Sequence, residues 1–282
     1  MTTALVEKAE RLRALHHTGR TLVLPNIWDP GGARMLEALG YPAVATASAS
    51  VAFSLGYDDG EQITLEAMLD VARRIAGAVQ VPVTADMERG WAESPDDVAA
   101  NMRAVLRAGV VGINLEDSVR EGEVMYDVAL AAARIQAVRE MARREGVPLV
   151  INARTDVYLR RTTASDAAKF DEAVARGRAY LAAGADCFFP ITLGDLPTLT
   201  RMQAALRAPI NVFAPTCRAS LPELEAAGIA RLSLGPGLYR AALTVMRNIA
   251  VELQQSGSFD GFTRNVISSG EIRKLLSKEP MR

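Results

Sequence analysis

The sequence of 282 residues predicts an α/β fold, namely a (β/α)8 barrel of the TIM type. Short apolar runs rich in Val, Ile and Ala recur eight times, as expected for parallel strands that are buried on both faces. Amphipathic stretches separate the runs, and glycines that fit helix C-caps, such as Gly109, Gly184 and Gly228, follow several of them. A doubly wound open sheet is the alternative, but no G-x-G-x-x-G follows the first run.

The predicted elements follow one another in regular order. A charged amphipathic helix over 1–15 precedes the barrel. The predicted strands are 21–25, 43–47, 81–85, 111–115, 148–152, 187–190, 210–214 and 231–234. The predicted helices lie near 31–39, 64–78, 96–108, 128–145, 165–183, 196–206, 221–227 and 236–255. We therefore expect one barrel domain over 1–282, in which 264–282 is a helical extension that packs on a neighbouring subunit.

Two helix starts carry explicit signals. Asp29 precedes Pro30 and Ser94 precedes Pro95, which is the pattern of an N-cap residue followed by proline in the first turn. We expect Asp29 to cap its helix. Because Ser94 caps the third barrel helix, the acids just before it have no capping role to fill.

Composition excludes several classes of function. The net charge is −1 and no basic stripe is present, so a nucleic-acid partner is not expected. No apolar run reaches 18 residues, so no membrane span is expected, and the interpretation is a soluble, cytoplasmic protein. Cys187 and Cys217 suggest neither a disulfide framework nor a zinc site. The only histidines precede the first strand and the four lysines lie on predicted helices, which argues against Schiff-base, Ser–His–Asp and His–zinc chemistry.

Acidic side chains gather where predicted strands end. In VPVTADMERGW (81–91), Asp86 and Glu88 follow the third strand, and Glu116 and Asp117 follow the fourth. Arg154 follows the fifth strand. Barrel enzymes work at this end of their strands, and converging carboxylates repel one another unless a cation relieves them. All-oxygen ligation suits Mg²⁺, with Mn²⁺ as a second option, although an acid after a strand is also a common helix cap.

At TADMERGW, INLEDS and VINARTDVYL, the sequence resembles the isocitrate lyase/phosphoenolpyruvate mutase superfamily, and the match extends from about residue 24 to 243. The resemblance implies that Asp86 binds Mg²⁺ directly, while Glu88, Glu116 and Asp59 hold metal-bound waters. It implies that Arg154 grips the substrate carboxylate or its developing oxyanion. The segment Ala47, Ser48 and Ala49 matches the loop whose backbone N–H groups bind that carboxylate. We add Asn211, at the end of the seventh strand, to the expected substrate contacts.

The sequence also departs from the family pattern. The loop after LEDS reads VREGEVMYDV and lacks the K-[KR]-C-G-H motif of isocitrate and methylisocitrate lyases. It also lacks the lysine and asparagine of the phosphonate mutases. A proton-transfer group must then come from Arg120, Glu121, Glu123 or Tyr126, although each is more often a solvated loop residue. We expect catalytic roles for Arg154, Glu116, Glu121 and Tyr126.

The expected function is a Mg²⁺-dependent lyase. It makes or breaks the C–C bond next to the enolate of a small 2-oxo or 2-hydroxy carboxylic acid. The alternatives are P–C chemistry on a phosphonopyruvate-like substrate, or a non-catalytic relative that binds oxo acids. Family relatives form tetramers through a swapped C-terminal helix, which implies a homotetramer, a dimer of dimers.

Overall fold

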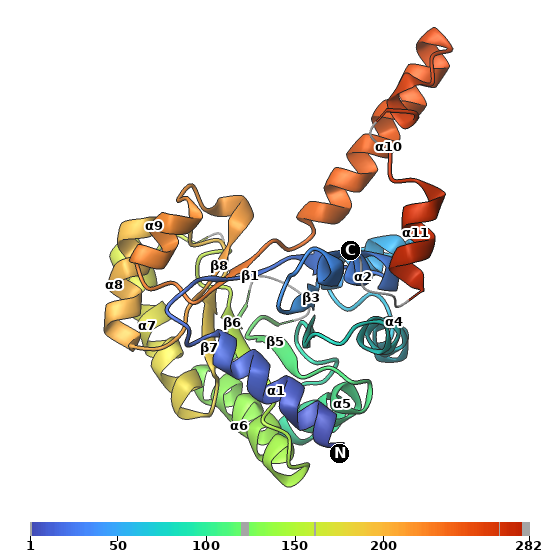
Figure 1. Ribbon diagram of the computed structural model, residues 1–282. Coiled ribbons are helices and arrows are strands. Elements are labelled where there is room, and N and C mark those ends of the chain that lie inside the picture. Colours follow the sequence, from blue (N-terminus) through green and yellow to red (C-terminus); the bar gives the residue numbers. More distant parts are fainter. Residues whose placement is uncertain (1, 120–123, 161, 265, 278–282) are drawn as a thin grey trace.

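The computed structural model describes residues 2–119, 124–160, 162–264 and 266–277 and shows a closed ring of parallel strands surrounded by helices (Figure 1). One ladder has the order β2-β3-β4-β5-β6-β7 and the other the order β1-β9-β8. The ladders join through the chain at Pro25 and through a parallel bridge between Phe188 and Ile210. The strands are β1 Leu22–Leu24, β2 Asn26–Ile27, β3 Val44–Thr46, β4 Val83–Asp86, β5 Gly112–Glu116, β6 Val150–Thr155, β7 Cys187–Pro190, β8 Asn211–Phe213 and β9 Arg231–Ser233. The predicted barrel is confirmed.

Most helices cover the outside of this ring, and α1 covers one end of it. Leu12 of α1 lies against Gly112 at the start of β5, where an added Cβ would come within 2.6 Å of the leucine side chain. Lys8 of α1 also donates a hydrogen bond to the Val79 carbonyl at 3.0 Å. The helix therefore closes the N-terminal end of the barrel and leaves the opposite end for the site. The helices are α1 Thr3–Leu15, α2 Pro30–Ala38, α3 Ser48–Ser54, α4 Leu65–Ala78, α5 Pro95–Arg107, α6 Val128–Arg144, α7 Asp166–Ala182, α8 Leu196–Leu206, α9 Leu221–Ala226, α10 Gly237–Ser256 and α11 Ser269–Leu276, with 3-10 turns η1 Ala214–Thr216 and η2 Asp260–Phe262.

Both predicted capping signals are confirmed. The Asp29 carboxylate accepts a hydrogen bond from the Gly32 amide at 2.7 Å, which satisfies one of the free donors of the first turn of α2. Ser94 accepts from the Asp97 amide in the same way at the start of α5. Neither Asp86 nor Glu88 is needed to start a helix.

The structure differs from the sequence prediction in the first strand and in the segment after the third strand. The predicted first strand is divided into β1 and β2 because Pro25 has no N–H with which to continue a ladder. Leu24 pairs with Ser233 of β9, whereas Asn26 pairs with Ala45 of β3. The short helix α3 follows β3, where no helix was predicted.

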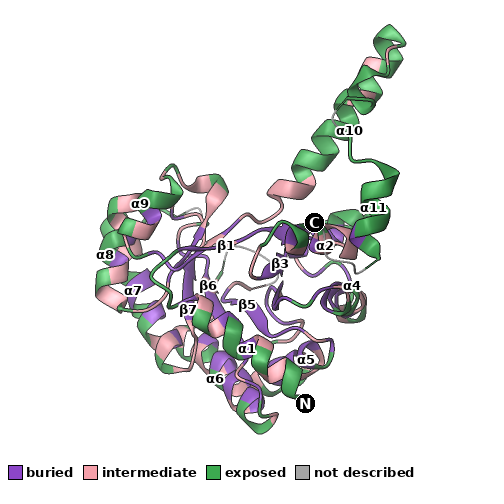
Figure 2. Ribbon diagram, in the orientation of Figure 1, coloured by how far each residue is buried: buried purple, intermediate pink, exposed green. Residues whose placement is uncertain are grey.

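The eighth predicted helix forms, but it does not cover its own barrel. The helix α10 forms over nearly the predicted range, but it projects away from the ring, and none of its residues is buried (Figures 1 and 2). Tyr239 anchors its first turn edge-on against Trp28, with 5.0 Å between ring centroids. The chain then returns, and α11 packs against α2 of the same chain, where Leu275 is buried. Helical periodicity alone does not reveal which surface an amphipathic helix covers.

The search for membrane spans covered the described residues. None of their helices combines the length and the apolar character needed to cross a bilayer.

Candidate metal and substrate site

A cavity of about 260 Å³ opens at the C-terminal end of the strands, the end at which barrel enzymes place their chemistry. It is lined by residues from nearly every strand or from the loop that follows it. The lining residues are Asn26, Ala47, Ser48, Ala49, Asp59, Asp86, Asn114, Arg154, Leu159, Phe189, Ile191, Thr192, Phe213, Ser233, Gly235 and Pro236. The barrel thus brings residues that lie far apart in the sequence to one chamber.

Asp86 is the last residue of β4, and three donors fix its carboxylate. Ser48 donates to Oδ2 through its hydroxyl at 2.9 Å and its backbone amide at 3.4 Å. Asn114 donates to Oδ1 from its Nδ2 at 3.3 Å. The Asp86 amide itself donates to the hydroxyl of Thr46 at 3.1 Å. The carboxylate is therefore held at the mouth of the barrel by side chains of the neighbouring segments.

Glu88 lies behind this carboxylate in an unusual backbone conformation. Its φ is +42°, in the left-handed region that a residue with a side chain seldom adopts, and its carbonyl accepts from the Glu116 amide at 2.8 Å. The side chain is buried, and burial, followed by the facing charges of Asp59, Asp86, Glu116 and Glu61, raises the pKa of Glu88 to about 9. Without a neutralising cation, this acid would be protonated at neutral pH.

Asp59 faces the same cluster from the loop after α3. The residue is exposed overall, yet burial of its carboxylate and then the charge of Asp86 raise its pKa. The acids that the resemblance assigned to the metal therefore act on one another electrostatically. Such mutual repulsion is what a divalent cation removes.

Arg154 connects the next two acids. Its Nη1 lies 2.7 Å from Oε2 of Glu116, which is its partner in the β5–β6 register, and its Nε lies 2.9 Å from Oδ1 of Asp156. Burial raises the pKa of Glu116, and the guanidinium of Arg154 opposes that shift. Because both acids are ionic partners of Arg154, the arginine stays charged and its planar head is fixed at the edge of the cavity.

A buried polar layer lies directly below the site. Oδ1 of Asn114 accepts hydrogen bonds from Nδ2 of Asn152 at 2.8 Å and from Nη2 of Arg231 at 3.2 Å. Arg231 is fully buried, and Asn211 is occupied by hydrogen bonds with Ser233. Asn114 therefore links the barrel interior to Asp86. No role was assigned to Asn114 from the sequence, although it lies near the end of the predicted strand 111–115.

Most of the residues chosen from the sequence meet at this cavity. Six of them line it: Ala47, Ser48, Ala49, Asp59, Asp86 and Arg154. Glu88 and Glu116 do not line the cavity, but Glu116 pairs with Arg154 at 2.7 Å and the charge of Asp86 acts on Glu88.

Two of the chosen residues that the structure describes, Asn211 and Tyr126, lie away from the cavity, and a third, Glu121, falls outside the described residues. Asn211 lies in the layer below, bonded to Ser233. The guanidinium of Arg134, on α6, stacks on the Tyr126 ring, with 4.3 Å from Cζ of Arg134 to the ring centroid. Glu121 falls on residues 120–123, outside the described residues, as do Arg120 and Glu123.

Sequence reasoning missed the apolar part of the lining. Phe189, Ile191, Phe213 and Pro236 contribute to the cavity from β7, β8, β9 and the loops after them. In the sequence these residues look like ordinary barrel core, because an apolar side chain at a strand end carries no chemical signal.

The donor set fits a magnesium ion bound through water. Among the described residues, no three His, Cys, Asp or Glu side chains converge closely enough to form a cage. Mg²⁺ does not need one, since it commonly binds one or two carboxylates and keeps several waters. Burial first, and then the charges of neighbouring acids, raise the pKa of Glu88 and of Asp59, and a bound cation would oppose both effects. Asp86 would bind the ion directly, and Asp59, Glu88 and Glu116 would hold its waters.

Comparison with known proteins identifies the family of the chain. The profile of the phosphoenolpyruvate phosphomutase family matches residues 12–254. An uncharacterised protein of Mycobacterium tuberculosis is 34% identical over 81% of this chain and 83% of its own. The 2-methylisocitrate lyase of Shewanella oneidensis is 29% identical over 87% and 84%. A solved protein from Burkholderia cenocepacia J2315, provisionally named a lyase/mutase, superposes with a TM-score of 0.90 at 34% identity and covers 99% of this chain and 98% of its own. The chain belongs to the phosphoenolpyruvate phosphomutase family, within the isocitrate lyase/phosphoenolpyruvate mutase superfamily.

Proposed function

We propose that the protein is a Mg²⁺-dependent lyase that makes or breaks the C–C bond next to the enolate of a small 2-oxo or 2-hydroxy carboxylic acid. One observation carries the proposal, namely the position of the Asp86 carboxylate. This carboxylate is held at a strand end among three further acids and lies close to the Arg154 guanidinium. A relative named 2-methylisocitrate lyase, which aligns over most of both chains, supports this class of reaction.

Each residue has a distinct role in the proposal. A bound Mg²⁺ would polarise the substrate's carboxylate and adjacent oxygen and would stabilise negative charge there. Ser48 orients Asp86 through two hydrogen bonds. The backbone amide of Ala49 lies in the first turn of α3, where N–H groups lack acceptors within the helix, and would bind the substrate carboxylate, whereas the Ser48 amide already donates to Asp86. Arg154 donates hydrogen bonds to the oxyanion from a head already fixed by Glu116 and Asp156.

The source of the proton is part of the proposal. The candidates for the general acid–base group that transfers the proton are Glu121 and Tyr126. Tyr126 would have to leave the Arg134 guanidinium to reach the cavity, because its ring is stacked there. We therefore propose Glu121, and not Tyr126, as the first candidate for the acid–base group.

P–C chemistry is less well supported by the cavity. A phosphonate needs a second cation, and Arg154 is the only positively charged side chain among the described lining residues. Two arginines that could supply this cation, Arg120 and Arg161, lie outside the described residues.

The proposal is tested by a screen of 2-oxo and 2-hydroxy acids, with and without Mg²⁺, for release of pyruvate or glyoxylate. We expect turnover that requires Mg²⁺ and is lost in Asp86→Asn. The matched control is Asp70→Asn, which removes a carboxylate from the exposed surface of α4. Mg²⁺-dependent binding of oxalate without turnover of any acid would favour the non-catalytic alternative. Oxalate binding that is independent of Mg²⁺ would contradict the metal site.

We also propose that the protein assembles as a homotetramer, a dimer of dimers, through its C-terminal arm, residues 237–282. The exposed apolar residues of α10 include Val245, Met246 and Leu253, with 58%, 60% and 50% of their surface accessible. A helix with such residues gains stability by burying them.

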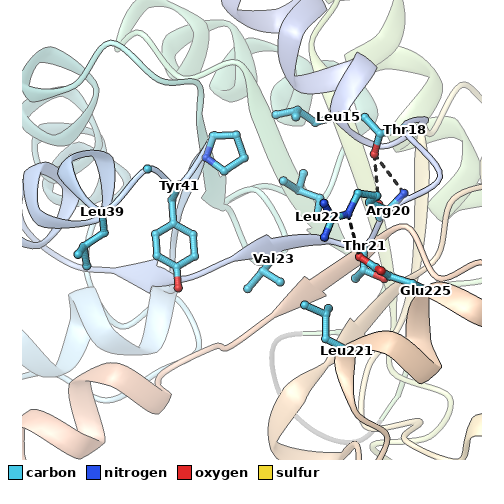
Figure 3. A pocket seen from close by; sticks show the side chains of 12 residues that line it. Leu15, Thr18, Arg20, Thr21, Leu22, Val23, Leu39, Tyr41, Leu221 and Glu225 are labelled. Carbon is cyan, nitrogen blue, oxygen red and sulfur yellow. Dashed lines mark hydrogen bonds and ion pairs between the residues drawn. The ribbon is translucent and has the colours of Figure 1, made fainter.

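The barrel has a matching groove of about 460 Å³ (Figure 3). In a barrel with a complete outer layer, the helix after β9 would lie between α9 and α2. Leu22, Val23, Tyr41 and Leu221 line the groove at this place, and its lining surface is mainly apolar. Because α10 of the same chain projects away, α10 of a second copy would cover the groove.

A further inference from the structure

The loop after β4, residues 87–92, holds Glu88 in a backbone conformation that side chains disfavour. Glu88 has φ +42° and Trp91 has φ +52°, and both values lie in the left-handed region. Gly90, between them, has φ +85°. Residues in such conformations persist only where the surrounding structure fixes them. The contacts that hold this loop therefore decide where the Glu88 carboxylate lies.

The Glu61 carboxylate makes three of these contacts. Its Oε1 accepts hydrogen bonds from the backbone amides of Arg89 and Trp91, at 3.0 and 2.9 Å. Its Oε2 lies 2.7 Å from Nη2 of Arg89, and both charged side chains are buried. The two amides flank Gly90, so one carboxylate oxygen fixes the backbone on both sides of that glycine.

The same contacts join loop 87–92 to the loop after α3. The Gly60 carbonyl accepts a hydrogen bond from Nη2 of Arg89 at 3.5 Å, and Nε1 of Trp91 donates to the Ile63 carbonyl at 2.9 Å. The two loops are thus bonded at Glu61 and on either side of it. A shift of one loop would break contacts made by the other.

Each of the two loops carries one acid of the cluster. Asp59 lies two residues before Glu61, and its charge acts on Glu88. Glu61 itself is buried and does not line the cavity in the described part of the chain. Because its two oxygens already accept three hydrogen bonds, this carboxylate is poorly placed to bind an ion directly.

We infer that Glu61 is a positioning residue for the metal site, which sets the places of the Asp59 and Glu88 carboxylates by bonding their two loops together. The effect comes from the hydrogen bonds that Oε1 accepts, and not from the negative charge. This inference rests on the proposed function, because it assumes that the acid cluster binds Mg²⁺.

The test measures the affinity for Mg²⁺ by calorimetric titration in the presence of oxalate. Glu61→Ala removes all three contacts, so we expect the affinity to fall about tenfold or more, as for other residues that orient metal ligands. Glu61→Gln keeps an oxygen for the two amides and loses the charge, so the affinity should stay within about threefold. Equal losses in the two variants would show that Glu61 acts through its charge and would overturn the inference.

Asp186→Ala is the matched control, at the opposite end of the barrel. Asp186 directly precedes β7 and also has three donors, namely the Ile151 amide at 2.8 Å and the guanidiniums of Arg13 and Arg139. Its loss should destabilise the fold but leave the affinity for Mg²⁺ within about twofold, because the two sites are far apart. If Asp186→Ala and Glu61→Ala lower that affinity equally, the effect is a general loss of stability and the inference is wrong.

A second variant serves if Glu61→Ala folds poorly. Glu61 has φ +59°, which glycine adopts without strain, so Glu61→Gly should be more stable than Glu61→Ala and yet lose the same affinity for Mg²⁺. Without Mg²⁺, hydrogen exchange at the Arg89 and Trp91 amides should be about tenfold faster in Glu61→Gly than in the unchanged protein. Unchanged exchange at both amides would contradict the role of Glu61.

The results separate this inference from the proposed function. If the unchanged protein binds oxalate without any dependence on Mg²⁺, the proposed function is wrong, and this inference with it. If Mg²⁺-dependent binding is present and is the same in Glu61→Ala and Glu61→Gly, the acid cluster stands and only the inference about Glu61 is wrong.

Discussion

Asn114 stands beside Asp86 in the register of β4 and β5, and its Nδ2 donates a hydrogen bond to Asp86 Oδ1 at 3.3 Å. The same amide accepts from Asn152 and from the buried guanidinium of Arg231 through its oxygen. The two ends of one side chain thus bond to the site on one side and to the barrel interior on the other. The orientation of the carboxylate that we propose as the metal ligand therefore depends on a residue that need not touch the metal.

Replacing Asn114 should therefore affect both the metal and the fold. In Asn114→Ala, the donors of Asn152 and Arg231 lose their buried acceptor, which costs about 1–3 kcal/mol of unfolding free energy. We also expect Mg²⁺ affinity to fall by roughly tenfold or more, as for other residues that orient a ligand. Isothermal titration with Mg²⁺ and oxalate, together with urea unfolding, measures the two effects. A loss of stability with unchanged Mg²⁺ affinity would show that Asn114 does not orient Asp86.

We predict that position 154 requires arginine and that lysine cannot replace it. The guanidinium pairs with Glu116 through Nη1 and with Asp156 through Nε, and it still presents the other N–H groups to a ligand. The ammonium of Arg154→Lys lacks this planar fork, so we expect oxalate affinity to fall about tenfold at saturating Mg²⁺. Equal affinity in titration would remove Arg154 from the substrate contacts. Arg201→Lys, in which an arginine on α8 that stacks on Phe170 is changed, is the control.

The buried histidine should make the protein less stable in mild acid. His16 bonds through Nδ1 to the Leu12 carbonyl at 2.8 Å, and burial, followed by the charge of Arg231, lowers its pKa to about 4. Because the unfolded chain has the ordinary value near 6.5, it binds more protons than the folded chain between about pH 6.5 and 4. Stability is therefore lost as the pH falls through this window, by about 3 kcal/mol at its lower end.

The contribution of His16 is isolated by comparing variants across this pH range. His16→Gln should lack this part of the decline in unfolding free energy, and His17→Gln, at an exposed position, should keep it. If the pH dependence of His16→Gln equals that of the unchanged protein, the buried histidine is not its source.

The C-terminal arm should govern assembly. Met246→Glu places a charge on the exposed apolar surface of α10, and deletion of 264–282 removes the returning helix. We expect each change to lower the oligomeric state in sedimentation velocity, because a charge buried in an apolar contact is costly. Leu130→Glu, at a 38% exposed leucine of α6, should leave the state unchanged. A tetramer that persists in both α10 and deletion variants would reject the swapped arm.

The pattern of short apolar runs and amphipathic stretches contained most of the fold. It determined the barrel, the approximate bounds of nearly every strand, and the caps at Asp29 and Ser94, because these depend on local periodicity and on nearby side chains. It also placed Asp86 and Arg154 at strand ends, and the common polarity of parallel strands then brings these residues to one side of the barrel.

Only the tertiary structure decided how those residues are used. Tyr126 and Asn211 stand at plausible positions in the sequence, yet one packs under Arg134 and the other bonds to Ser233. The sequence likewise gave no reason for Phe213 to face the cavity or for α10 to leave the barrel. These outcomes depend on contacts between segments that are far apart along the chain, and local patterns carry no record of which segments meet.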